Sequence, residues 1–419
     1  MSDSQKMKLT SIGLIPEDWE AIPLSKVGIF GKGSGVTRAN AQSGNIPCIR
    51  YGEIYTSHND YIKAFYSHIS SEIASTATKL KKGDVLFAGS GETKEEIGKA
   101  VAFLGDEEAY AGGDIIILSP NVESSSMYLG YVLNSKSAVA QKASMGQGDA
   151  VVHIHAKELA DVVIPWPKVE EQEKIANALS SIDALISGLN KAIEKNRQIK
   201  EGLMQNLLTG RTRLIEDGEW HEVELREFGH MIRGVSYKPE ESSITPKTDY
   251  IKLLRSNNIQ AGQMVYDDYV YVDVTNVSDE QFMRKGDILV CMANGSKQLV
   301  GKTARLTRDG VYTFGAFMGV FRCDDVELSA FVAELLKTGH YRKLLDDILT
   351  GSAINNLNAS AVENLKFRVP SSKKEQLAIS TVLTKVDDEI QALESQRHKY
   401  NLIKQGMMQE LLTGKTRLI

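Results

Sequence analysis

Apolar residues recur at intervals of three and four in two long stretches of the chain. The first series is Ile175, Leu179, Ile182, Ile186, Leu189, Ile193, Ile199, Leu203 and Leu207. The second is Ile379, Leu383, Val386, Ile390, Leu393, Tyr400, Ile403, Met407 and Leu411. This spacing predicts two amphipathic helices that pair as a coiled coil. Each has about 40 residues and so a length of about 60 Å.

Helix-breaking residues mark the ends of both series. Pro167 and Pro370 precede them, and Gly210 and Gly414 follow them, which is where proline and glycine are favoured around a helix. The rest of the chain reads as short alternating strands with glycine turns and a few helices. The sequence therefore predicts an α/β chain in four parts, with globular domains at 1–167 and 211–370, a central helix at 168–210 and a distal helix at 371–419.

The two predicted helices are copies of one unit. Residues 171–215 and 375–419 align without a gap at an offset of 204, and 21 of the 45 positions are identical. The identical pairs include Glu171/Glu375, Gln172/Gln376, Leu179/Leu383, Asp183/Asp387, Gly202/Gly406 and Gly210/Gly414. A duplicated domain and helix indicate a pseudo-twofold internal repeat, with two globular domains separated by two long antiparallel coiled-coil helices.

Weaker similarities extend the repeat into the globular parts. LKKGDVLFAGSG (80–91) resembles MRKGDILVCMANG (283–295), and Trp19 and Trp220 stand at matching places. The sequence TRLIEDGEW follows the first helix, whereas the second ends in TRLI and the N-terminal segment contains IPEDW. Joined end to start, the chain would repeat this junction, so we expect the two termini to lie close together.

Composition narrows the class of protein only slightly. Three scattered cysteines (Cys48, Cys291, Cys323) argue against a disulfide framework and favour a reducing, cytoplasmic location. No apolar run is long enough to span a membrane, and the N-terminal segment lacks the apolar core of a signal peptide. The net charge of -5 argues weakly against nucleic-acid binding, although the location of the positive charge matters more than its sum.

Several catalytic patterns are approached but not met. FAGSG (87–91) resembles a methyltransferase cofactor loop, but its counterpart VCMAN (290–294) lacks both glycines, and the chain has no Pro-Pro pair. SKQLVGKT (296–303) has Ser296 where a phosphate-binding loop needs glycine. His153 and His155 alternate on an expected strand but lack a third metal ligand. We therefore expect no catalytic residue and no metal site.

Polar and basic residues gather where the expected strands end, at similar places in both domains. Arginine, asparagine, glutamine and lysine read base edges or neutralise phosphates. The candidate DNA-binding residues of the first domain are Arg50, Tyr51, Ser90, Glu92, Thr93, Lys94, Lys99 and Gln147. Those of the second are Arg255, Ser256, Asn257, Asn258, Asn294, Ser296, Lys297, Gln298 and Lys302. Any one of them could equally lie in a solvated loop, so the matching positions carry the argument.

The duplicated helix motifs resemble those of the specificity subunit of Type I restriction-modification enzymes. The motif Glu-Gln-x-x-Ile-x-x-x-Leu-x-x-x-Asp and the closing Leu-Leu-Thr-Gly fall on Glu171, Gln172, Ile175, Leu179, Asp183 and 207–210, and on Glu375, Gln376, Ile379, Leu383, Asp387 and 411–414. The resemblance covers essentially the whole chain. It implies that each globular domain is a target recognition domain that reads one half of a split DNA sequence.

The resemblance also implies the partners. Two modification subunits, which carry S-adenosylmethionine and methylate adenine, would dock on the helices, and ATP- and Mg-dependent restriction subunits would join them. No cofactor is expected in this chain. The residues expected at the helix–helix or partner interface are Gln172, Ile175, Leu179, Asp183, Leu207, Gln376, Ile379, Leu383, Asp387 and Leu411. Two alternatives stay open, a fused methyltransferase and a coiled-coil scaffold without a DNA role.

Overall fold

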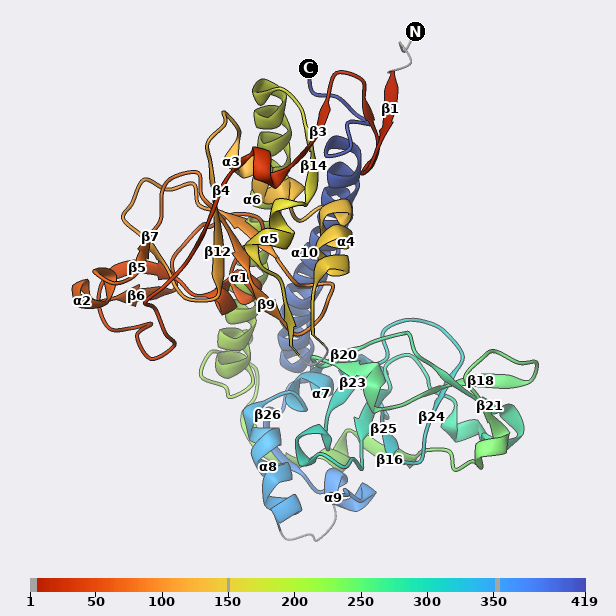
Figure 1. Cartoon of the computed structure of the whole chain (residues 1–419). Helices are drawn as coiled ribbons and strands as arrows, with labels where there is room; N and C mark the ends of the chain where they lie inside the picture. The colour runs from red at the N-terminus through yellow and green to blue at the C-terminus, as the bar shows by residue number, and fades with distance from the viewer. Residues whose placement is uncertain (1–5, 149–150, 351–354) are drawn as a thin grey trace. The chain divides into compact units, whose positions relative to one another are not determined.

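The structure is a computed structural model that describes residues 6–148, 151–350 and 355–419. Its contacts divide the chain into two units, each built from a globular domain and parts of both long helices (Figure 1). The first unit comprises residues 1–190 and 395–419, and the second comprises residues 191–394. Among the described residues, no helix is long and apolar enough to cross a membrane.

The first unit is built around two four-stranded sheets. One is antiparallel in the order β10-β8-β12-β4, and the other has the order β6-β5-β11-β7 with β5 and β11 parallel. Its strands are β1 (Met7–Thr10), β2 (Gly13–Pro16), β3 (Glu20–Pro23), β4 (Gly28–Lys32), β5 (Ile46–Ile49), β6 (Ser67–Ile69), β7 (Thr78–Lys79), β8 (Val85–Ala88), β9 (Ser90–Gly91), β10 (Ala100–Ala102), β11 (Tyr110–Ala111), β12 (Ile115–Pro120), β13 (Val152–His153) and β14 (Val163–Trp166). Its short helices are α1 (Tyr51–Thr56), α2 (Ser71–Ala74), α3 (Ser126–Val132), α4 (Lys136–Met145) and α5 (Ala156–Ala160).

The second unit repeats this plan. The sheet β16-β25-β22-β23 corresponds to β4-β12-β8-β10. In the other sheet β21-β18-β24 correspond to β6-β5-β11, whereas the fourth strands, β17 and β7, lie on opposite edges. Its strands are β15 (Trp220–Glu224), β16 (Gly229–Arg233), β17 (Ser242–Ser243), β18 (Tyr250–Leu254), β19 (Ile259–Gln260), β20 (Gln263–Met264), β21 (Val270–Asp273), β22 (Ile288–Cys291), β23 (Thr303–Arg305), β24 (Tyr312–Phe314), β25 (Met318–Cys323) and β26 (Lys366–Pro370). Its short α-helices are α7 (Ser329–Leu335), α8 (Gly339–Thr350) and α9 (Ala359–Glu363).

Strand register makes the repeat residue-specific. Ile115 pairs with Ala88 in the first unit, and Met318 pairs with Cys291 in the second. Both members of the pair are therefore displaced by 203 residues. The expected repeat thus extends into the strand pairs β8/β22 and β12/β25, at an offset one residue shorter than that of the helices.

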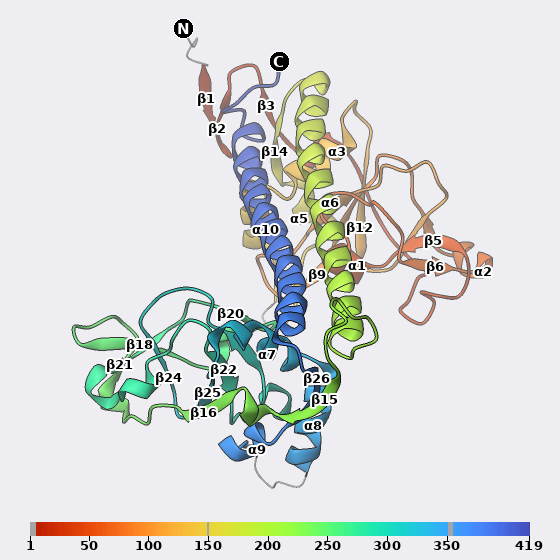
Figure 2. The same cartoon turned by 180° about the vertical axis from the view of Figure 1, so that it is seen from behind.

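The two predicted long helices are present as α6 (Val169–Leu207) and α10 (Lys373–Leu411). In the first unit their segments run antiparallel, because Lys404 pairs with Asp183 while Arg397 bonds Asn190 (Figure 2). In the second unit the same sense follows from the ion pairs Arg197–Glu394 and Lys200–Asp387. Both helices end before a glycine with positive φ (Gly210 at 73°, Gly414 at 69°), as the glycine stops predicted.

Each long helix packs part of its apolar series into the core of a domain. In the first unit Ile175, Leu179 and Leu411 are buried in one cluster with Trp19 and Tyr128. In the second unit Leu207, Ile379 and Leu383 are buried with Phe331 and Phe367. The helices are therefore integral to the domain cores as well as to the coiled coil.

Two stretches that alternate like strands in sequence begin as a strand and continue as a helical turn. In IPCIRYGEI the strand β5 ends at Ile49, and α1 begins at Tyr51, because the Glu53 carboxylate accepts the backbone N–H of Arg50 and caps the helix. In YIKLLRSNNI the strand β18 ends at Leu254 and a 3-10 turn follows (Ser256–Asn258). The period-two pattern holds only for the first half of each stretch.

Candidate nucleic-acid interface

Arg50 and Arg255 occupy equivalent places, each directly after the strand that pairs in parallel at the centre of the second sheet. Arg50 donates to the Glu53 carboxylate and to the Ser67 hydroxyl, the latter at 2.9 Å from Nε. Tyr51 follows with 43% of its surface exposed. The first arginine is thus held by a buried carboxylate while its neighbour faces solvent.

Arg255 is held differently. Its Nη2 donates to the carbonyl and carboxylate of Asp268 at 3.1 and 3.3 Å, and Asn257 donates to the same carboxylate at 2.6 Å. Asn258 is fully buried and donates to two backbone carbonyls of the following hairpin. Arg255, Asn257 and their shared carboxylate lie at the surface, whereas Asn258 stabilises the loop beneath them.

The loop after β8 carries four candidates of the first domain, and a fifth, Gln147, lies beside the strand that pairs with it. Ser90 Oγ lies 3.0 Å from His153 Nδ1, and the Gln147 backbone pairs with that of His153. Tyr55 donates its hydroxyl to the Ser90 carbonyl at 2.7 Å. The loop continues with three exposed residues, Glu92, Thr93 and Lys94.

The expectation that both histidines lie on one strand was wrong. β13 ends at His153, whereas His155 is the N-cap of α5, where its backbone N–H donates to Glu158. The capping contact interrupts the alternation on which the expectation depended. Across residues 6–148, 151–350 and 355–419, no group of three metal-ligating side chains comes together.

Lys99 and Lys302 sit at equivalent positions, and both ammonium groups are bound to backbone. Lys99 Nζ donates to the His58 carbonyl at 2.6 Å, and burial lowers the pKa of this lysine. Lys302 Nζ donates to the Ile259 carbonyl at 3.2 Å. These contacts hold the strand β10 or β23 to the neighbouring loop, so a DNA phosphate would have to compete with them.

Five of the nine candidates of the second domain line two separate cavities. Arg255, Ser256 and Asn294 line a cavity of about 1110 Å³, while Gln298 and Lys302 line another of about 320 Å³ beside α8. Lys297 donates from Nζ to the Thr350 hydroxyl at 3.3 Å, and Ser296 is exposed beside it. The candidate residues of the second domain therefore do not form one cluster.

Sequence reasoning overlooked Phe317, Asn355 and Tyr237, which line the larger cavity of the second unit. Phe317 is 73% exposed. Its first-domain counterpart is Asp114, because Gly89 N donates to the Asp114 carbonyl just as Met292 N donates to that of Phe317. Aligning GGDII with GAFMG at the offset of 203 would have found this pair.

The polar residues of the helix motif have structural partners. Gln172 donates to the Pro167 carbonyl and Gln376 to the Pro370 carbonyl, each closing the entry to its helix. Asp183 accepts from the Tyr131 hydroxyl at 2.6 Å and pairs with Lys404. Asp387 pairs with Lys200 at 2.6 Å, so the Lys–Asp contact between the helices occurs in both units.

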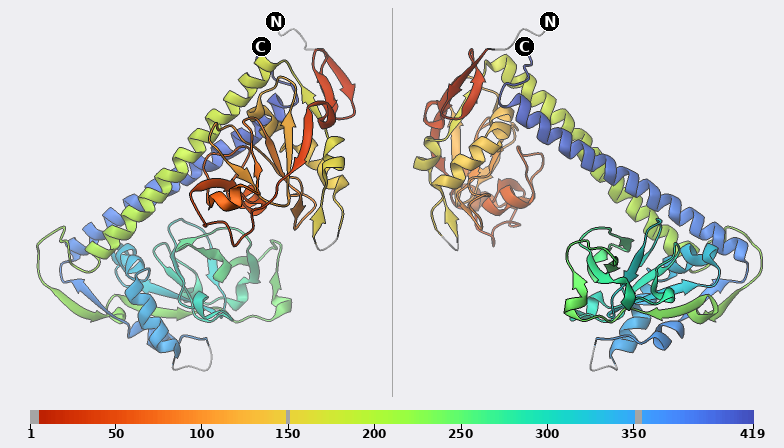
Figure 3. Two further views of the ribbon diagram at one scale, coloured as in Figure 1. Left: turned by 60° about the vertical axis from the view of Figure 1, so that its left-hand side comes forward. Right: turned by 90° about the vertical axis from the view of Figure 1, so that its right-hand side faces the viewer.

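An arginine that follows the end of each long helix binds a carboxylate at the start of the other long helix. In the first unit Arg417 bonds Glu171 and Asp18 through both carboxylates, and Trp19 donates to Glu171 at 3.0 Å. Burial acts to raise the pKa of Glu171, but the hydrogen bonds from Arg417 and Trp19 outweigh it, so the net shift is downward. Arg213 bonds Glu375 in the second unit. Residues from near both termini thus meet in the first unit (Figure 3), as the junction sequences predicted.

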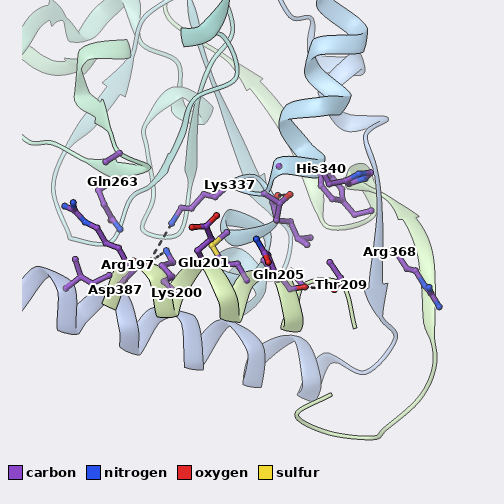
Figure 4. Close-up of a pocket in the computed structure, with 18 of the residues that line it drawn as sticks. Arg197, Lys200, Glu201, Gln205, Thr209, Gln263, Lys337, His340, Arg368 and Asp387 are labelled. Atoms are coloured by element: carbon purple, nitrogen blue, oxygen red, sulfur yellow. Dashed lines mark hydrogen bonds and ion pairs between the residues drawn. The ribbon is translucent and has the colours of Figure 1, made fainter. Parts of the chain in front are cut away.

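A groove of about 1030 Å³ lies within the second unit, between the helix segments and the domain (Figure 4). Lys200, Glu201 and Gln205 of α6 form one side, and Lys337 and His340 face them from the domain. Lys200 is fixed by Asp387 and by Glu334 at 3.2 Å. The lining also includes the apolar side chains Met204, Leu208, Leu335 and Phe367.

The comparisons with known proteins agree with one another. The family model of the Type I restriction modification DNA specificity domain matches residues 16–200 and 217–404. The Type I restriction enzyme MjaVIII specificity subunit of Methanocaldococcus jannaschii is 24% identical over 424 residues, which cover 96% of this chain and 94% of the relative.

Two solved structures share the fold. The S subunit of a Type I restriction-modification system from M. genitalium matches with a TM-score of 0.63 at 16% identity, over 97% of this chain and 98% of that one. A chain from a structure concerned with complex assembly and conformational transition of the type I R-M system matches with a TM-score of 0.52 at 15% identity, over 96% and 99%. Because the family model covers most of both halves, the chain belongs to the Type I restriction-modification DNA specificity family and is a DNA-binding specificity subunit.

Proposed function

We propose that each globular domain reads one half of a bipartite DNA target. The observation that supports this most is a common frame with different side chains at its loops. Arginine follows the central strand in both domains, but Gly91 and Asp114 of the first domain correspond to Asn294 and Phe317 of the second. Equivalent loops with different hydrogen-bonding groups suit two readers of different sequences. The target is then split and asymmetric.

An exchange of one domain tests this proposal. Residues 211–370 are replaced by the second domain of another family member, and the chain is coexpressed with its modification subunit. Mapping methylated adenines on a randomised DNA library should show one half-site changed and the other unchanged. A change in both halves, or in neither, would count against separate readers.

We further propose that the two long helices act as a spacer and as the docking site for two modification subunits. The expected interface residues Ile175, Leu179, Ile379 and Leu383 are fully buried in the domain cores, so a partner would use the other helix faces. Those faces expose apolar side chains at Leu185, Ile199 and Leu402. The groove in Figure 4 adds an indented surface beside α6.

Charge introduction at the exposed helix positions tests the docking proposal. Ile199→Asp and Leu402→Asp should weaken co-purification with the modification subunit, because a carboxylate cannot be buried unpaired at an interface. Ile244→Asp is the matched control, since Ile244 is 86% exposed on the second domain. Equal co-purification of all three variants would show that the helices are not the docking surface.

The same proposal assigns no catalysis to this chain. S-adenosylmethionine would be bound by the modification subunits, and ATP and Mg by the restriction subunits. The FAGSG turn is the strand end β8–β9, where Gly89 is packed against the Asp114 carbonyl, which supports a structural role for it. Methyl transfer from S-adenosylmethionine to DNA by the purified chain alone would favour the fused-methyltransferase alternative. Absence of DNA binding in the assembled complex would favour the scaffold.

A further inference from the structure

The large cavity of the second unit combines an exposed aromatic side chain with hydrogen-bonding side chains. It is lined by Arg255 and Ser256 after β18, by Asn294 after β22, by Phe317 in the turn between β24 and β25, and by Asn355. These side chains come from loops far apart in the sequence. Their convergence on one cavity of about 1110 Å³ provides both hydrogen-bonding and apolar contacts for a single ligand group.

The backbone around Phe317 is fixed while its ring remains free. The Phe317 carbonyl accepts the N–H groups of Met292 and Ala293 at 2.9 and 3.1 Å, and Met318 N donates to the Gly315 carbonyl at 2.8 Å. Gly234 packs so closely on Gly315 that an added Cβ would lie 2.0 Å from its carbonyl oxygen. The ring is therefore presented on a rigid turn with 73% of its surface in solvent.

The polar groups beside the ring are also held in place. Asn294 Oδ1 accepts from Ser296 N at 3.0 Å, which fixes the amide and points Nδ2 toward Ser256, 3.5 Å away. Arg255 is anchored through Nη2 to Asp268, and 39% of its side-chain surface remains exposed. An amide and a guanidinium held beside the cavity are suited to the acceptors on a base edge.

We propose that this cavity reads a base step of the second half-site, with Phe317 as a specificity residue that contacts the methyl group of a thymine. The inference rests on the proposed function of the second domain as a DNA reader. Phenylalanine against the thymine methyl and arginine or asparagine against purine acceptors are recurrent major-groove contacts. The first domain, with Asp114 at the equivalent turn, lacks the apolar contact and reads a different step.

The test removes the methyl group and the ring separately. The complex of the full chain with its modification subunit is measured for binding to its own target, with each thymine of the second half-site replaced in turn by deoxyuridine. One position should lose about fourfold in affinity, as expected for one buried methyl group. Phe317→Ala should lose a similar factor on the thymine target and show no further loss with deoxyuridine.

Two controls separate the possible failures. Val326→Ala removes an exposed side chain, 59% accessible, from the same unit outside the cavity, and should keep the full deoxyuridine effect. If the wild-type complex reads the second half-site but Phe317→Ala behaves like Val326→Ala, or if no deoxyuridine position matters, the inference about Phe317 is wrong and the domain remains a reader. If the wild-type complex shows no preference in the second half-site, the proposed function itself fails.

Discussion

Lys142 provides a prediction about stability whose size follows from its surroundings. The side chain is fully buried in the first unit, and Nζ donates to the carbonyls of Gly98 and Leu133 at 2.6 and 2.8 Å. Burial lowers the pKa of this lysine to about 7. A neutral amine has two N–H groups, and the two carbonyls accept both, so the neutral form is satisfied without a counter-charge.

The sign of the pH dependence follows from linkage. In the unfolded chain the lysine binds its proton up to a pH near 10.4, whereas in the folded chain it releases it near pH 7. The unfolded state therefore binds more protons in this window, and stability rises with pH. Between pH 7 and pH 9 the gain amounts to about 2 kcal/mol, at roughly 1.4 kcal/mol for each pH unit above the folded pKa.

The assay compares the wild-type chain with Lys142→Met. Unfolding in urea is monitored through hydrogen exchange in peptides from α3 and α4. The difference in unfolding free energy between the two proteins should shift by about 2 kcal/mol from pH 7 to pH 9, in favour of the wild type at high pH. Lys136→Met is the control, since Lys136 is exposed on the same helix. A difference that stays constant with pH would refute the neutral, buried lysine.

Three further outcomes are expected. Arg417→Ala leaves the Glu171 carboxylate, 8% exposed, without its cation, and should lower the free energy of unfolding in urea by about 3–5 kcal/mol. Arg197→Ala, which removes one side of an exposed ion pair, should lower it by less than about 1 kcal/mol. Arg255→Ala or Lys297→Ala should cost about 1–3 kcal/mol and relax one half-site if the residue contacts a base, whereas an equal loss on all sequences in the binding assay would mean a phosphate contact. Inserting one heptad after Asn190 and a second after Glu394, where the units divide, lengthens both helices by about 10 Å. The preferred gap between half-sites should then widen by about 3 bp in a spacer library. An unchanged gap with full activity would show that the helices are not the spacer.

The site for that insertion shows what the structure adds to the sequence. The end of α6 near Leu208 is a natural choice from the sequence, because there the helix meets the second domain. In the structure Leu207 and Leu208 are buried in the second core, so an insertion at that point would disrupt packing instead of adding length. The apolar periodicity predicts the helix but cannot say which domain covers its faces.

Local sequence patterns also explain which features of the fold and of the candidate site were predictable and which were not. The long helices and the repeat depend on local spacing and glycine stops, and both were predictable. Lys99 and Lys302 look like loop cations in the sequence, but their bonds to backbone carbonyls depend on chain crossings that only the fold provides. Phe317 lies in an apolar stretch that resembles a core strand, and its exposure follows from the turn between β24 and β25.

The central claim, that two domains of one chain read two halves of one target, is tested most directly by mapping methylated adenines in cells that express this chain with its modification subunit. Two readers on one chain should give a single asymmetric motif of two short blocks separated by an unread gap of fixed length, which disappears when the chain is omitted. A continuous motif without a gap, or the same methylation in the absence of the chain, would contradict it.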